Sequence, residues 1–197
     1  MTASGNLYLA LIHHPVYNKN GEVIASAVSN LDLHDISRAA KTYGVRAFYI
    51  VTPLSDQREL VERIISHWTE GLGARYNPDR REALRLIKIA ISLDTVRDEI
   101  ARNGDGLPVT VVTHARPHQR NITYGALAKM IKSNRPYLLL FGTAWGLTQE
   151  FIDKADYVLA PIMGHTGYNH LSVRSAAAIV LDRLLGREEK IFSNPEL

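Results

Sequence analysis

Short apolar segments recur along the whole chain, and stretches with helical periodicity separate them. The segments that we predict as strands are Leu7–His13, Val45–Val51, Leu86–Ile91, Val109–Thr113, Tyr137–Phe141 and Tyr157–Ala160. They are apolar without alternating polar positions, which is typical of parallel strands that are buried on both faces.

The predicted helices follow these strands and are marked by capping residues at their starts and glycines near their ends. They begin at Asp32 or His34, Ser55 or Asp56, Asn77–Asp79, Ser92, Tyr124, Thr148 and Leu171. The first ends at Gly44, the second at Gly71–Gly73 and the last at Gly186. This alternation predicts an α/β fold with a mostly parallel sheet and helices on both of its faces.

The chain has 197 residues, which suffice for one domain with a full core. We assign residues 1–190 to a single domain and treat 191–197 as a C-terminal tail. Residues 18–21, Asn-Lys-Asn-Gly, have the composition of a turn. The apolar stretch Leu7–Ile12 is short and has no basic leader, so we expect neither a signal peptide nor a membrane span. We therefore expect the protein to be cytoplasmic.

Composition excludes some chemistry and leaves other chemistry open. Cysteine is absent, which excludes disulfides and thiolate metal sites. His114 and His118 have helical spacing, but Pro117 interrupts any helix between them, so we expect no metal site. The net charge of +3 permits a polyanionic partner without requiring one.

Three loops follow predicted strands in the C-terminal half: Val112–Pro117, Phe141–Leu147 and Pro161–Leu171. Ligands of parallel sheets bind beyond the carboxyl ends of the strands, so these loops are candidates for a binding site. Gly142 and Gly146 allow close approach of the backbone and unusual backbone angles. Neither G-x-x-x-x-G-K-[ST] nor G-x-G-x-x-G follows a strand, which disfavours other nucleotide-binding classes.

The three loops, in this order and running into the alanine-rich helix after Ser172, resemble those of the SPOUT methyltransferases. These are S-adenosylmethionine-dependent RNA enzymes, and the likeness is closest to a branch of poorly defined substrate. The resemblance implies a deep C-terminal trefoil knot, methyl transfer to tRNA or rRNA, and a homodimer whose pocket is completed across the last helix. The cofactor-binding residues that it implies are Thr113, His114, Ala115, Leu140, Gly142, Thr143, Gly146, Ile162, Gly167, Tyr168, Leu171, Ser172, Val173 and Ala177.

The methyl acceptor stays open at this point. Residues 32–45 are similar to a segment of the ribose-directed members, with Arg38 at the position of their catalytic arginine. Those members have Asn where this chain has Asp32, and Asn-Val-Ser where it has Ser172-Val173-Arg174. Base-directed members often have an aspartate after the third loop, where this chain has Asn169 and His170. The alternative is that Arg38 is a solvated helix residue, and this is the favoured interpretation.

A second hypothesis is a knotted module that binds RNA or a ribosome without methyl transfer. The basic cluster Arg75–Lys88 and the loop Arg116–Arg120 are either RNA contacts or solvated surface. Trp145 either contacts a ligand or locks its loop by packing, and packing is the favoured reading. Leu181, Leu184 and Leu185 are expected to supply apolar contact at the dimer interface.

Overall fold

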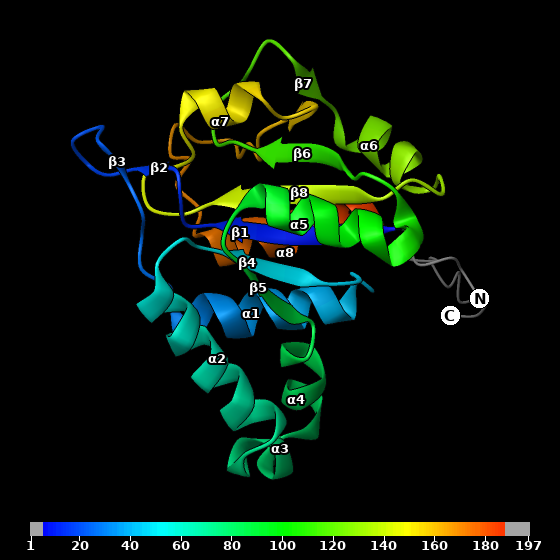
Figure 1. Cartoon of the computed structure of the whole chain (residues 1–197). Helices are drawn as coiled ribbons and strands as arrows, with labels where there is room; N and C mark the ends of the chain where they lie inside the picture. The colour runs from blue at the N-terminus through cyan, green and yellow to red at the C-terminus, as the bar shows by residue number, and fades with distance from the viewer. Residues whose placement is uncertain (1–5, 188–197) are drawn as a thin grey trace, which may run out of the picture.

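The computed structural model describes residues 6–187, and a seven-stranded parallel sheet forms its centre (Figure 1). The strand order is β5-β4-β1-β8-β6-β9-β7. The strands are β1 (Leu7–Ile12), β4 (Phe48–Val51), β5 (Ile87–Ala90), β6 (Val109–Thr113), β7 (Asn121–Ile122), β8 (Tyr137–Gly142) and β9 (Tyr157–Leu159). The predicted α/β class with a parallel sheet is therefore confirmed.

Helices cover both faces of the sheet because side chains of each strand alternate between two cores. Leu7, Leu9 and Leu11 of β1 enter one core, while Tyr8, Ala10 and Ile12 enter the other. The first core receives α1 (Asn30–Thr42), α2 (Ser55–Thr69), α4 (Pro78–Leu84), α6 (Tyr124–Ile131) and α8 (Val173–Leu185). The second receives α5 (Leu93–Ile100), which a short π-helix (Ala101–Asp105) follows, and α7 (Gln149–Asp153).

Four short elements were missed by the sequence analysis. They are the antiparallel hairpin of β2 (Val16–Tyr17) and β3 (Val23–Ile24), the edge strand β7, and α3 (Leu72–Tyr76). The strands among them have two residues each, too few for any hydrophobic period to appear. The glycines at 71 and 73 were read as the end of α2, but Gly73 is buried inside α3 against Trp68.

The last helix packs more deeply than expected. Leu181 and Leu184 are buried in the core, and Leu185 packs against the same core. The predicted apolar dimer surface is therefore wrong for Leu181 and Leu184, because both are buried in the core; for Leu185, which is partly exposed, the contact stays a prediction.

The pairing of the strands sets where the site can form. Ile12 of β1 is in register with Gly142 of β8, Leu140 of β8 with Val112 of β6, and Thr113 of β6 with Leu159 of β9. The loops after these strands therefore leave the sheet at one edge, and Figure 1 shows the β2–β3 hairpin at that edge.

Three sequence predictions stay predictions here: the limits of the domain, the trefoil knot and the tail, which lies outside the described residues. Within residues 6–187, no helix combines the length and apolar character needed to cross a membrane.

Candidate functional site

A cavity of about 1100 Å³ lies at the carboxyl ends of β6, β8 and β9, between the three loops. Most of the residues implied by the family resemblance line it. They are Thr113, His114, Ala115, Gly142, Thr143, Gly146, Ile162, Gly167, Leu171, Ser172 and Val173. The cavity is where a parallel sheet is expected to bind its ligand.

Three implied residues do not line the cavity. Leu140 is buried in β8, where its carbonyl accepts a hydrogen bond of 3.0 Å from Thr113 Oγ1. Ala177 is buried inside α8, against the core. The Tyr168 ring is 74% exposed and lies edge-on to His170, beside the lining residues of the third loop. Any contact of these residues with a ligand stays a prediction.

The sequence analysis missed one wall of the cavity. Tyr17, Asn18, Lys19 and Gly21 of the β2–β3 hairpin line it, as does Tyr124 at the start of α6. The turn composition of residues 18–21 was visible in the sequence, but nothing in it indicated that the turn faces the three loops.

The second loop is fastened to this hairpin. The Trp145 backbone N–H donates to the Tyr17 carbonyl at 3.0 Å, and the Tyr17 N–H donates to the Gly146 carbonyl at 2.9 Å. Trp145 lines the cavity and is 69% exposed, so the interpretation that it locks the loop by packing is wrong.

The two glycines of this loop act differently. Gly146 has a φ of 102°, which a residue with a Cβ adopts only under strain. Gly142 has ordinary backbone angles, but a Cβ there would lie 2.8 Å from Leu147 Cγ and 3.1 Å from the Leu147 nitrogen. Gly142 is therefore needed for close packing within the loop.

A chain of polar side chains that begins at the buried His13 holds the start of the second loop. His13 is fully buried, and its Nδ1 lies 3.0 Å from Ser26 Oγ. Ser26 Oγ lies 2.6 Å from Thr143 Oγ1, which donates to the Ile12 carbonyl at 3.1 Å. Burial lowers the pKa of His13 to about 4, so the ring is neutral at neutral pH.

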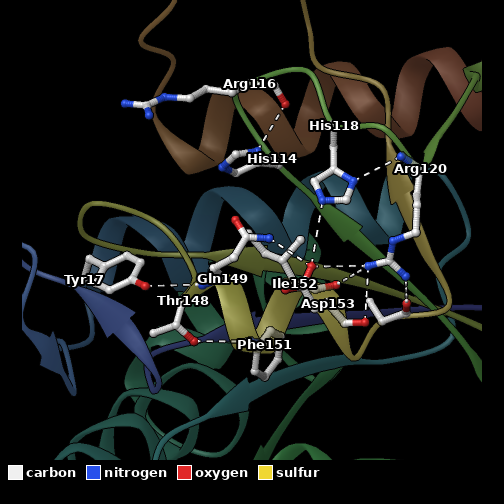
Figure 2. A network of polar contacts seen from close by, with 11 residues as sticks. Tyr17, His114, Arg116, His118, Arg120, Thr148, Gln149, Phe151, Ile152 and Asp153 are labelled. Atoms are coloured by element: carbon white, nitrogen blue, oxygen red, sulfur yellow. Dashed lines mark hydrogen bonds and ion pairs between the residues drawn. The ribbon is translucent and has the colours of Figure 1, made fainter.

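The first loop is tied to the third loop, and Arg120, which follows the first loop, is tied to α7. Asn169 Nδ2 donates to the Ala115 carbonyl at 2.9 Å, which joins the first loop to the third. Figure 2 shows Arg120 against the end of α7, where its guanidinium donates to the carbonyls of Ile152, Asp153 and Ala155. Arg120 therefore caps a helix, whereas the Arg116 guanidinium points away from α7. An RNA contact of Arg116 stays a prediction.

An ion pair closes the cavity on the side of α1. Asp32, in the first turn of α1, lines the cavity, and its Oδ1 accepts from Arg174 Nη1 at 2.9 Å. Arg174 Nε lies 3.4 Å from Asp35 Oδ2. Burial raises the pKa of Asp32, and Arg174 opposes that rise. Arg38 is exposed on α1 and does not line the cavity, so its catalytic role stays a prediction.

The residues of the cavity fit an adenosyl ligand. Phe141, Leu147 and Ile162 supply apolar walls for a base, and the backbone of the three loops supplies polar groups. A cavity of this size is large enough for a cofactor of that class. Among the described residues, no group of three His, Asp or Glu side chains is placed to hold a metal ion.

The chain shares its fold with solved methyltransferase structures. More specifically, residues 6–186 match the sequence model of a family described as SAM-dependent RNA methyltransferase, and the chain belongs to that family.

Two relatives illustrate the range of similar proteins. A tRNA (guanine-N(1)-)-methyltransferase of Nitratidesulfovibrio vulgaris is 46% identical over 181 residues, which are 92% of this chain but 42% of that protein. An uncharacterized protein of Aquifex aeolicus is 39% identical over 183 residues, 92% of this chain and 89% of that protein. The chain thus spans less than half the length of the relative that has a functional name.

Solved structures share the fold at low sequence identity. A putative methylase family protein of Neisseria gonorrhoeae is 17% identical with a TM-score of 0.62, over 93% of this chain and 83% of that one. The SpoU methyltransferase AviRb of Streptomyces viridochromogenes, solved in complex with AdoMet, is 18% identical with a TM-score of 0.54, over 91% of this chain and 58% of that one.

Replacing Gly142 by alanine tests the packing of the second loop. The added Cβ displaces Leu147, so we expect S-adenosylmethionine affinity to fall about tenfold or more, together with a lower Tm. Calorimetric titration and thermal unfolding measure both. Gly164→Ala is the control, because its Cβ meets no atom within 4 Å, and it should change neither quantity. Unchanged affinity in Gly142→Ala would contradict this view of the loop.

The buried His13 predicts a pH dependence of stability. The unfolded state binds a proton below pH 6.5 and the folded state only near pH 4, so the free energy of unfolding falls as the pH decreases through this window. Between pH 7 and pH 5 this one group accounts for a loss of about 2 kcal/mol. Urea unfolding of His13→Gln should show a pH dependence weaker by that amount.

The exposed His165 of the third loop provides the matched control. His165→Gln should retain the pH dependence of the wild type. The same dependence in His13→Gln as in the wild type would show that the His13 ring is not held neutral.

Proposed function

We propose that this chain binds S-adenosylmethionine in the three-loop cavity and transfers the methyl group to RNA, as a homodimer in the cytoplasm. One observation carries the proposal: loops from three separate strands, each singled out by sequence, line a single cavity. The family to which the chain belongs supports the reaction class. The trefoil knot belongs to the same proposal, because it would hold the second and third loops together.

The RNA is proposed at the level of class, either tRNA or rRNA. The name of the Nitratidesulfovibrio relative favours tRNA. That name describes a protein more than twice as long as the matching region, so its guanine-N(1) specificity is not carried over to this chain. The Aquifex relative, which is of similar length to this chain, has no substrate in its name.

Different parts of the cavity would bind the adenine and the ribose of the cofactor. We assign the adenine to the apolar walls and to the backbone of residues 162 and 171, and the ribose to the second loop at Gly142 and Thr143. The bound cofactor supplies a methyl group on a sulfonium, which is a good leaving group. The protein then has to align the RNA atom and remove its proton.

Exposed apolar side chains support the dimer. Trp145 of the second loop and Met163, Tyr168 and Leu171 of the third are exposed at or beside the cavity. A partner subunit over these loops would bury them and complete the pocket. Arg38 would then act on RNA only if the assembly brings its exposed face of α1 to a neighbouring cavity.

Titration with S-adenosylmethionine tests the central proposal and its alternative. We expect saturable binding, and transfer of labelled methyl groups to total RNA from a strain that lacks the protein. Nucleoside mass analysis identifies the product. RNA binding without cofactor binding at millimolar concentration would favour the non-catalytic RNA- or ribosome-binding module.

The predicted role of Arg38 has its own test. Arg38→Ala should reduce kcat for methyl transfer at least tenfold and leave the S-adenosylmethionine Kd unchanged, because Arg38 lies outside the cavity lining. Lys41→Ala, which removes a charge from the same helix, is the control. Equal rates in both variants and the wild type would remove Arg38 from the mechanism.

A further inference from the structure

We propose that Asp32 accepts the proton of the RNA atom that is methylated, and that Arg174 positions its carboxylate. This inference rests on the proposed function. It supplies the proton acceptor that the third loop lacks, since that loop has Asn169 and His170 instead of an aspartate.

Asp32 is the only carboxylate among the described residues that line the cavity. Its side chain is 11% exposed, and one of its two oxygens is occupied: Oδ1 accepts from Arg174 Nη1 at 2.9 Å. No described residue forms a hydrogen bond with Oδ2. The carboxylate is therefore fixed by one oxygen and free to accept a proton at the other.

Arg174 connects this carboxylate to the cofactor loops. It follows Val173, a lining residue, directly in the chain and lies in the first turn of α8. Its second contact, with Asp35 Oδ2 at 3.4 Å, restrains the guanidinium from the other side. The carboxylate and the third loop are thus held at a defined separation by one side chain.

The two positions that depart from the ribose-directed pattern meet in this ion pair. The aspartate at 32 and the arginine at 174 lie 142 residues apart in sequence, yet they contact each other in the cavity wall. The aspartate alone would place a largely buried, unpaired charge there, which is costly. The pair together keeps a carboxylate in the cavity.

The proton balance of the step is simple. The acceptor nitrogen or oxygen of the RNA forms a bond to the methyl carbon, and the carbon–sulfur bond breaks with its electron pair left on sulfur. The proton of that nitrogen or oxygen passes to Asp32 Oδ2. Burial raises the pKa of Asp32, which makes its carboxylate a better proton acceptor than an exposed one.

Two histidines, His114 and His170, also line the cavity, but neither is as well placed as Asp32 to accept a proton from RNA. His170 is exposed, and its ring lies edge-on to Tyr168. His114 Nδ1 is 3.1 Å from the Arg116 carbonyl in the first loop, among the residues assigned to the cofactor. Asp32 lies on α1, outside all three loops, and faces the cavity from a separate wall.

Asp32→Asn is the first test, because it preserves the shape of the side chain and the acceptor for Arg174 but cannot take up a proton. We expect kcat to fall about 100-fold or more, with the S-adenosylmethionine Kd within a factor of about three. Asp79→Asn is the matched control: it removes the same charge from the first turn of another helix, α4, where Asp79 is exposed and lies outside the cavity lining. Its kcat should stay within about threefold of the wild type.

Asp32→Glu separates a proton acceptor from a structural residue. Glutamate retains the carboxylate but changes the length, whereas asparagine retains the length. A proton acceptor predicts more activity in Asp32→Glu than in Asp32→Asn, and a structural role predicts the reverse. The acidic limb of the kcat–pH profile should be present in Asp79→Asn, where the pair of Asp32 and Arg174 is intact, and absent from the residual activity of Asp32→Asn.

Carboxyl NMR of the protein without cofactor gives a readout besides activity. The signal lost in Asp32→Asn should titrate above the ordinary aspartate range, and its pKa should rise further in Arg174→Ala, because the opposing guanidinium is gone. A fall of that pKa in Arg174→Ala would overturn the assignment.

The outcomes distinguish this inference from the proposed function. An active wild type with unchanged kcat in Asp32→Asn, or with Asp32→Asn more active than Asp32→Glu, overturns the inference alone. Loss of activity in His114→Gln together with an active Asp32→Asn also overturns it. A wild type that neither binds S-adenosylmethionine nor methylates RNA overturns the proposed function and the inference with it.

Discussion

The parallel pairing of β1, β8, β6 and β9 is the constraint on which the site depends. It places Gly142, Thr113 and Leu159 at one edge of the sheet, although long stretches of chain separate them. Each strand is buried on both faces, so a slip of register would move its side chains between two filled cores. The register of the strands therefore fixes where the loops begin, and with them the position of the cavity between the loops.

The second loop needs support beyond the sheet, and polar groups at the end of β1 supply it. His13 contacts Ser26, and the Ser26 hydroxyl contacts that of Thr143 in the second loop. The backbone of Tyr17 in the hairpin forms hydrogen bonds with the backbone of Trp145 and Gly146. Because the His13 ring is buried and neutral, this support depends on pH as well as on packing. The N-terminal quarter of the chain therefore supplies one wall of the cavity and supports the second loop, while the C-terminal half supplies most of the lining.

Sequence reasoning reached the strands, the long helices and most of the cavity lining, because uninterrupted apolar runs and glycine-bounded loops leave local signals. It missed the β2–β3 hairpin, whose strands are too short for a pattern, and it assigned Leu181 and Leu184 to the surface. Their helical spacing is compatible with either a core or an interface, and only the packing against the sheet decides between them. Gly142 was singled out for close approach of the backbone, and a Cβ there would indeed meet Leu147. Its approach to a ligand stays a prediction.

The contact between Asp32 and Arg174 shows what local patterns cannot supply. In the sequence, Asp32 and Arg174 are two separate departures from the pattern of the ribose-directed methyltransferases. In the structure they form an ion pair of 2.9 Å in the wall of the cavity. Arg174 thereby compensates the charge of the largely buried Asp32 carboxylate. Since Arg174 continues directly from the third loop, any shift of that loop moves the carboxylate as well. In the mechanism that we propose, cofactor binding and proton removal would be coupled through the Arg174 side chain.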